Sequence, residues 1–229
     1  MKRGLWAVVT LAGLLMLPRM QRDATGVWSV AAPMREAGAS TSVAYTLEEL
    51  IDTTATVVLA RAVSRESRWE EVGGSKRIVT YTVLDVEEEV MGAAPAKVWV
   101  RTLGGTVGDV GQHVAGEARF EVGVRSVVFL TRAASGVSVV AGAAQGHYPA
   151  FVKDPDPEDE GGSDGDDDIA ARLRPSPSLG HIVERPGPRI TALQRLVGRT
   201  VPDAVATIVE AKAELDAHRN ETPRDDTGR

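Results

Sequence analysis

The chain contains no cysteine and few aromatic residues. Its 229 residues include three Phe, three Tyr and four Trp, and the formal net charge at pH 7 is −6. The absence of cysteine excludes disulfide frameworks, thiolate metal sites, thiol nucleophiles and lipid attachment to an N-terminal cysteine. The scarcity of aromatic residues argues against a platform for stacking bases or sugars. The negative charge, without a visible basic patch, argues against a nucleic-acid partner.

The N-terminal segment has the pattern of an export signal, because two basic residues precede an uncharged run from Leu5 to Leu17. A helix of that length rises about 20 Å, short of the roughly 30 Å hydrocarbon core, which favours a signal peptide over an anchor. Cleavage at Ala37-Gly38-Ala39 would remove residues 1–39, and Ser29-Val30-Ala31 is a closer alternative. We expect an exported protein that is periplasmic, cell-surface or extracellular, with no stable membrane span after cleavage.

Residues 40–153 have the pattern of a mainly β domain. Thr46, followed by two glutamates in a first turn, predicts one short helix. After it, β-branched and apolar runs alternate with turn signals and show no helical period, which predicts an antiparallel barrel or sandwich. The segment Arg65–Ser75, between the first two strands, is predicted to be a polar hairpin loop. The predicted strands are Thr56–Val63, Lys76–Val86, Lys97–Leu103, Arg125–Arg132, Val137–Ala141 and His147–Val152.

Residues 154–188 are acidic and then rich in proline, a composition that predicts a disordered insertion. Asp154–Asp168 holds nine acidic residues and no basic one. Carboxylates are calcium ligands, so a calcium-responsive surface protein is one hypothesis. However, Ile169 stands where the calcium loop of an EF-hand needs glycine. A solvated loop is the simpler interpretation of this segment.

Two helices are predicted over residues 189–219, followed by a disordered tail at 220–229. Gly198 is placed to end the first helix, and Thr200-Val-Pro-Asp203 resembles the capped start of the second. Both helices are expected to pack on the strands. Their predicted apolar stripes are Ile190, Leu193, Leu196 and Val197, and then Val205, Ile208, Val209 and Leu215.

The segment Gly104–Gly116 contains five glycines, too many for an ordinary strand. It predicts a loop that needs positive φ or close backbone approach, either as a structural cover for one end of the barrel or as a binding loop. Asp109, His113 and Glu117 are spaced by four and could hold zinc on a helix, although the glycines oppose a helix. A metal-dependent enzyme that uses these three residues, with His147 joining them, is the alternative to a binding protein.

The succession of segments from Thr46 to Phe151 resembles a group of uncharacterised exported bacterial proteins. Its most specific pieces are Leu103-Gly104-Gly105 and Phe120–Leu130. The strand order also resembles the OB-like barrel of netrin-like domains, the fold of tissue inhibitors of metalloproteinases. Those inhibitors chelate the protease zinc through an N-terminal cysteine, which this chain lacks, so the resemblance implies the fold and not the inhibition. It implies no catalytic residues.

Together these patterns predict a mainly β protein: an antiparallel OB-like β-barrel with a short N-terminal helix and two C-terminal helices. The predicted function is non-catalytic binding of a protein or surface ligand without a cofactor, because no pair of catalytic side chains has a spacing that forces contact. Trp99 is expected to be a packing residue within its strand. The predicted recognition surface consists of Trp69, Arg101, Gly104, Gly105, Asp109, His113 and Arg119.

Overall fold

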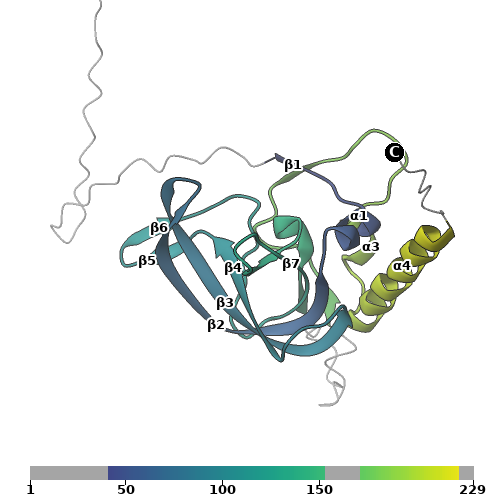
Figure 1. Ribbon diagram of the computed structural model, residues 1–229, viewed down its shortest axis with the longest axis horizontal. Coiled ribbons are helices and arrows are strands. Elements are labelled where there is room, and N and C mark those ends of the chain that lie inside the picture. Colours follow the sequence, from purple (N-terminus) through teal and green to yellow (C-terminus); the bar gives the residue numbers. More distant parts are fainter. Residues whose placement is uncertain (1–40, 153–170, 222–229) are drawn as a thin grey trace, which may run out of the picture. The chain divides into compact units, whose positions relative to one another are not determined.

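The computed structural model describes residues 41–152 and 171–221, and the described chain is mainly strand with three α-helices (Figure 1). All six predicted strand segments and all three predicted helices are present. The elements in chain order are β1 (Thr41–Val43), α1 (Leu47–Asp52), β2 (Thr56–Val72), β3 (Ser75–Met91), β4 (Lys97–Leu103), β5 (Gly105–Val107), β6 (Val110–Gln112), β7 (Arg125–Arg132), β8 (Ser138–Val140), the 3-10 turn η1 (Ala143–Gly146), β9 (His147–Phe151), β10 (Arg172–Leu173), β11 (His181–Val183), α3 (Ala192–Leu196) and α4 (Val201–Glu221).

The main sheet has seven strands in the order β10-β9-β7-β2-β3-β4-β8. Strand β8 also pairs with β7, so the pairings β7-β2-β3-β4-β8 return to β7. The pairing of β4 with β8 is parallel, and the other pairings of this sheet are antiparallel. The prediction of a mainly antiparallel β core is therefore confirmed.

Strands β2 and β3 form a hairpin in which each strand has 17 residues. The prediction of a loop at Arg65–Ser75 is wrong, because β2 continues to Val72 and the turn consists of Gly73 and Gly74. Both glycines have positive φ, as a two-residue hairpin turn requires. Strand β7 pairs with β2 from Thr56 to Arg61, so the outer half of β2 lies at an edge. Charged side chains protect such an edge from pairing with other chains, which explains its loop-like composition.

Two hydrophobic clusters lie on opposite faces of the central strands. Because side chains alternate along a strand, Val57 and Leu59 face helices α1, α3 and α4, which lie together beside the strands in Figure 1. Val58 and Ala60 face the other way. The first cluster includes Leu47, Leu50, Val127, Phe129, Tyr148, Leu173, Leu196 and Ile208, and the second includes Leu84, Val98, Val100, Phe120, Val128 and Leu130.

The N-terminal helix begins as predicted. The Thr46 side chain accepts a hydrogen bond from the Glu49 amide, and the Glu49 carboxylate accepts one from the Thr46 amide. This reciprocal capping box satisfies two backbone donors that the first turn would leave unpaired.

The C-terminal helices form where predicted, and their apolar stripes are confirmed in part. The predicted stripe residues Leu196 and Ile208 are buried, and Leu193, Val205 and Leu215 pack against the first hydrophobic cluster. The prediction for Val197 is wrong, because its side chain is 38% exposed. In α3 the buried residues are Ala192 and Leu196, whereas Ile190 precedes the helix and is exposed. In α4 the prediction that Val209 belongs to the buried stripe is wrong, because its side chain is 49% exposed. Small residues give a helix a closer approach to its neighbours than the larger Val or Leu would. The packed face of α4 consists of Val201, Ala204, Thr207, Ile208 and Ala211.

The prediction of disorder across residues 154–188 is wrong for the described part, which starts at Ala171. Strand β10 pairs with β9, and β11 pairs with β1 in a separate parallel pair. Leu173 is 1% exposed and belongs to the first hydrophobic cluster, so this segment buries apolar surface despite its prolines. The acidic stretch Asp154–Asp168, the leader 1–39 and residues 222–229 of the tail lie outside the described residues.

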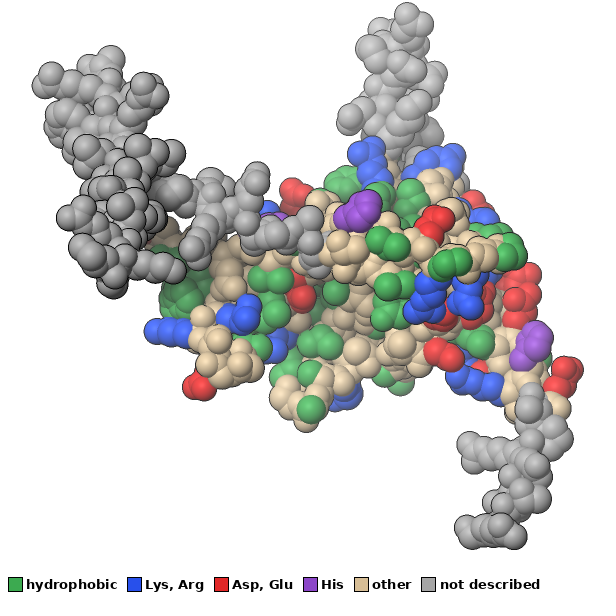
Figure 2. Space-filling model, turned by 90° about the horizontal axis from the view of Figure 1, so that it is seen from above, with side chains coloured by type: hydrophobic (Ala, Val, Ile, Leu, Met, Phe, Trp, Pro, Cys, Tyr) green, Lys and Arg blue, Asp and Glu red, His purple; other side chains and the backbone are tan. Residues whose placement is uncertain are grey.

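Charged side chains of both signs are interspersed on the face that Figure 2 shows. Ion pairs also join α1 to the segment before α3, where the Glu49 carboxylate contacts Arg185 at 2.6 Å and Arg189 at 3.0 Å. Exposed ion pairs of this kind contribute about 0–1 kcal/mol each. In the part of the chain that the structure describes, no helix has both the length and the apolar character needed to cross a membrane.

Candidate functional site

The glycine-rich segment packs against the β2–β3 hairpin. Its residues form the small hairpin β5–β6, and Gly105 has a φ of +131°. A Cβ atom on Gly105 would lie 2.3 Å from Thr80 Oγ1 and 2.4 Å from Ser67 Oγ, so only glycine fits this contact. Gln112 Oε1 accepts a hydrogen bond of 2.7 Å from the Ile78 amide. The predicted need for positive φ and close approach is confirmed, and these contacts give the segment a structural role.

The predicted recognition residues do not form one surface. Trp69 is opposite Ile78 in the strand register, and Arg101 is opposite Tyr81. Ile78 and Tyr81 are three residues apart on β3, so alternation directs Trp69 and Arg101 to opposite faces of the sheet. The Arg101 guanidinium instead donates to the Glu70 carboxylate at 3.2 Å.

Arg119 is close to Arg65 on β2. Arg65 and Arg101 are on opposite faces of the sheet, because their register partners on β3, Thr82 and Tyr81, are adjacent residues. Burial lowers the pKa of the Arg65 guanidinium, and the neighbouring positive charge of Arg119 lowers it further. The Arg65 guanidinium donates a hydrogen bond of 2.9 Å to the carbonyl of Phe120. This hydrogen bond connects the segment before β7 to the outer half of β2. Arg119 is therefore part of this structural contact and not of a surface shared with Arg101.

The structure does not assemble the predicted metal site. Asp109 lies in the exposed turn between β5 and β6, and His113 is also exposed. Burial raises the pKa of the Glu117 carboxyl, which accepts a hydrogen bond from the backbone of Leu103. Among the described residues there is no group of three or more His, Asp or Glu side chains placed to hold a metal ion.

His147 is also unavailable as a ligand, because it is 2% exposed and both ring nitrogens have partners. Its Nδ1 lies 3.1 Å from Ser176 Oγ, and its Nε2 lies 3.1 Å from Ser126 Oγ. The ring packs against Phe120 with centroids 4.4 Å apart. Burial lowers the pKa of His147 to about 3, so the imidazole is neutral at physiological pH. This buried network joins the segment after β10 to the sheet.

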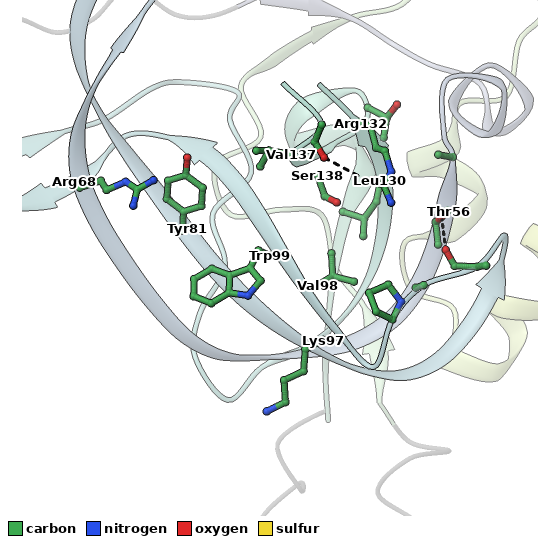
Figure 3. A pocket seen from close by; sticks show the side chains of 16 residues that line it. Thr56, Arg68, Tyr81, Lys97, Val98, Trp99, Leu130, Arg132, Val137 and Ser138 are labelled. Carbon is green, nitrogen blue, oxygen red and sulfur yellow. Dashed lines mark hydrogen bonds between the residues drawn. The ribbon is translucent and has the colours of Figure 1, made fainter. Parts of the chain in front are cut away.

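A groove of about 460 Å³ lies between β4 and the β7–β8 hairpin (Figure 3). Trp99 stands in the middle of the view, with Tyr81 and Arg68 on one side and Val137 and Ser138 on the other. The lining residues contain no carboxylate and no imidazole. They are Ala55, Thr56, Arg68, Tyr81, Ala93, Ala94, Pro95, Lys97, Val98, Trp99, Leu130, Thr131, Arg132, Gly136, Val137 and Ser138.

The groove combines an exposed aromatic surface with positive charge. The prediction that Trp99 is a packing residue is wrong, because its side chain is 56% exposed. The Arg68 guanidinium lies 4.3 Å from the centroid of the Tyr81 ring, a cation–π contact. The Tyr81 hydroxyl and the Arg68 guanidinium both donate to Glu70, which fixes their positions at one end of the groove.

Sequence reasoning missed this groove, although one signal was present. In Lys97–Leu103, valine and threonine occupy the even positions, and their face is buried. Trp99 stands on the opposite, polar face with Lys97 and Arg101, and alternation therefore places its indole on the outside. The residues of the β7–β8 hairpin that line the groove with Trp99 come from a distant part of the chain, and no local pattern identifies them.

Comparison with known proteins gives no relative, since no family model matches the chain and neither a curated protein nor a solved structure is significantly similar to it.

Proposed function

We propose that the protein is an exported binding module, built on an OB-like five-stranded barrel, that holds its ligand in the Trp99 groove. The barrel is supported by the ring of pairings through β2, β3, β4, β8 and β7. In an OB barrel the face of the second and third strands, with the loop between the fourth and fifth, is the usual binding surface. Here those parts correspond to β3, β4 and the β7–β8 loop, and all three line the groove.

One observation carries this proposal: a large aromatic side chain is left exposed in a concave site. Trp99 keeps more than half of its surface in water although neighbouring Val98 and Val100 are buried. Exposed tryptophan is enriched at the centre of binding sites, because it contributes a large contact area at low entropic cost. The hydroxyl groups and cations around it can orient a ligand. The lining lacks the paired acid and base groups of hydrolytic sites, which favours binding over catalysis.

Replacing Trp99 with alanine is expected to weaken ligand binding at least tenfold, because the change removes the aromatic centre of the groove. The labelled full chain is applied to arrays of peptides and oligosaccharides. Trp69→Ala is the matched control, since Trp69 is also exposed but lies near the β2–β3 turn, outside the groove. Signals that persist in Trp99→Ala and disappear in Trp69→Ala would assign binding to the surface around Trp69 and refute the groove.

Export is part of the same proposal, and it is supported by the basic residues and the apolar run Leu5–Leu17. When the full chain is expressed in a bacterial host, we expect a shortened form outside the cytoplasm. Leu14→Arg places a charge in the apolar run and should retain the chain inside. Fractionation followed by mass spectrometry of the N-terminus checks both results. Equal export of the two chains would contradict the proposed signal.

A further inference from the structure

We propose that the groove binds an extended acidic peptide, which adds as a strand to the open edge of β4. This inference rests on the proposed function and names the class of ligand. It depends on two features that the groove combines: a stretch of strand edge without a neighbouring strand among the described residues, and two cations, Lys97 and Arg132, that form no ion pair with a described residue.

The edge of β4 is open at the groove. On one side β4 pairs with β3 along its whole length, from Lys97 to Leu103. On the other side, the register between β4 and β8 in the described chain consists of the single pair Val100↔Ser138. On that side, the part of β4 that precedes Val100 has no strand of the described chain beside it, and Lys97, Val98 and Trp99 line the groove at this point.

The backbone of this stretch is oriented to accept another strand. The Val86 amide donates to the Ala96 carbonyl at 2.8 Å, and the Gly104 amide donates to the Ile78 carbonyl at 2.8 Å. Bonds alternate along an antiparallel pair, so the even-numbered residues of β4 bond to β3. The amide and carbonyl of Lys97 and the amide of Trp99 therefore point to the open edge. An extended peptide can satisfy them, as in recognition by strand addition.

The charge of the lining selects an acidic peptide. Lys97 and Arg132 line the groove and form no ion pair with any described residue, although Asp85 is opposite Lys97 in the strand register. The Arg132 guanidinium contacts the Gly136 carbonyl at 3.5 Å. Arg68 also lines the groove, but its guanidinium is paired with the Glu70 carboxylate at 2.9 Å. In a strand laid along β4, alternate side chains point to the same face, so carboxylates at every second position can approach these cations. Strand addition needs a peptide backbone, which favours a peptide over an acidic oligosaccharide.

The test uses isothermal titration of the full chain with four synthetic peptides of seven residues, capped at both ends. In the first peptide glutamate alternates with threonine and valine. In the second and third, glutamine or lysine replaces glutamate. The fourth is the acidic peptide with N-methyl groups on alternate amides, which removes donors along one edge. We expect binding of the acidic peptide, about fivefold weaker binding of the glutamine peptide, and at least tenfold weaker binding of the lysine and N-methylated peptides.

Single substitutions test which lining residues contribute to binding of the acidic peptide. Lys97→Ala and Arg132→Ala should each weaken binding of the acidic peptide by about two- to fivefold, and the loss should shrink in 0.5 M salt. Lys76→Ala is the control, because Lys76 lies over the Trp69 ring near the hairpin turn and outside the groove; its affinity should not change. Circular dichroism confirms that each variant is folded.

Three results would overturn the inference: equal binding of the acidic and glutamine peptides, equal binding of the N-methylated peptide, or no binding of any peptide. If the arrays yield a Trp99-dependent ligand that is an acidic oligosaccharide, the inference fails while the proposed function stands. If neither arrays nor peptides give Trp99-dependent binding, both fail.

Discussion

Phe129→Ala is expected to lower the free energy of unfolding by about 3–5 kcal/mol, the usual loss for a large aromatic residue in a core. Phe129 is fully buried between the sheet and the helices, and its ring lies 6.0 Å from that of Tyr148 in an edge-on arrangement. Alanine would leave a cavity where β7 meets the helices. Because a domain of this size is stable by about 5–15 kcal/mol, the loss is a large part of the total. Urea unfolding of the full chain measures it.

Tyr148→Phe is the matched control for this prediction. The Tyr148 hydroxyl is buried without a hydrogen-bond partner among the described residues, and burial raises the pKa of this phenol. Removing the hydroxyl eliminates an unpaired polar group and keeps the ring, so stability should stay equal or rise. A loss below about 1 kcal/mol in Phe129→Ala would mean that the helices do not pack on this face of the sheet.

Acidification below pH 6.5 is expected to destabilise the fold through His147, by about 1.4 kcal/mol for each pH unit. In the unfolded chain the imidazole gains a proton near pH 6.5. In the folded chain burial lowers the pKa of His147 to about 3. Between these values the unfolded state holds one more proton than the folded state, so the free energy of unfolding falls as the pH falls. Above pH 6.5 both states are neutral, and His147 adds no pH dependence.

His147→Gln isolates this effect, because glutamine keeps polar atoms between Ser126 and Ser176 but does not titrate. Urea unfolding of both chains at pH 7, 5.5 and 4.5 gives the comparison. Carboxylates titrate in both chains, so the difference between the two slopes reports His147 alone. Parallel stability curves for the two chains would contradict the assignment of a buried, neutral imidazole.

Local patterns predicted the elements well and their packing less well. The start of the helix at Thr46 and the strand Lys97–Leu103 depend on neighbouring residues, and both formed as expected. The prediction of a loop at Arg65–Ser75 failed because an edge strand can be as polar as a loop. The prediction of disorder after Ala171 failed because the few apolar residues of this segment, such as Leu173, pack against residues of distant strands and helices.

The candidate site could be located only from the three-dimensional fold. Sequence reasoning placed it at the glycine-rich segment, since glycine clusters are typical of loops that approach a ligand. In the structure the close approach of Gly105 is to Thr80 and Ser67 of the same chain. The groove forms instead where β4 and β8 begin to pair, and the location of that point depends on the three-dimensional register.

Amide chemical shifts of the isotope-labelled full chain, recorded with and without the acidic peptide, test the central claim most directly. If the peptide adds to β4 in the groove, the amides of Lys97 and Trp99 and the Trp99 indole should shift in a saturable way. The amide signals of residues 104–116 and the signal of the Trp69 indole should keep their chemical shifts. Shifts confined to residues 104–116 or to the Trp69 indole, with an unchanged Trp99, would contradict the claim that this groove is the binding site.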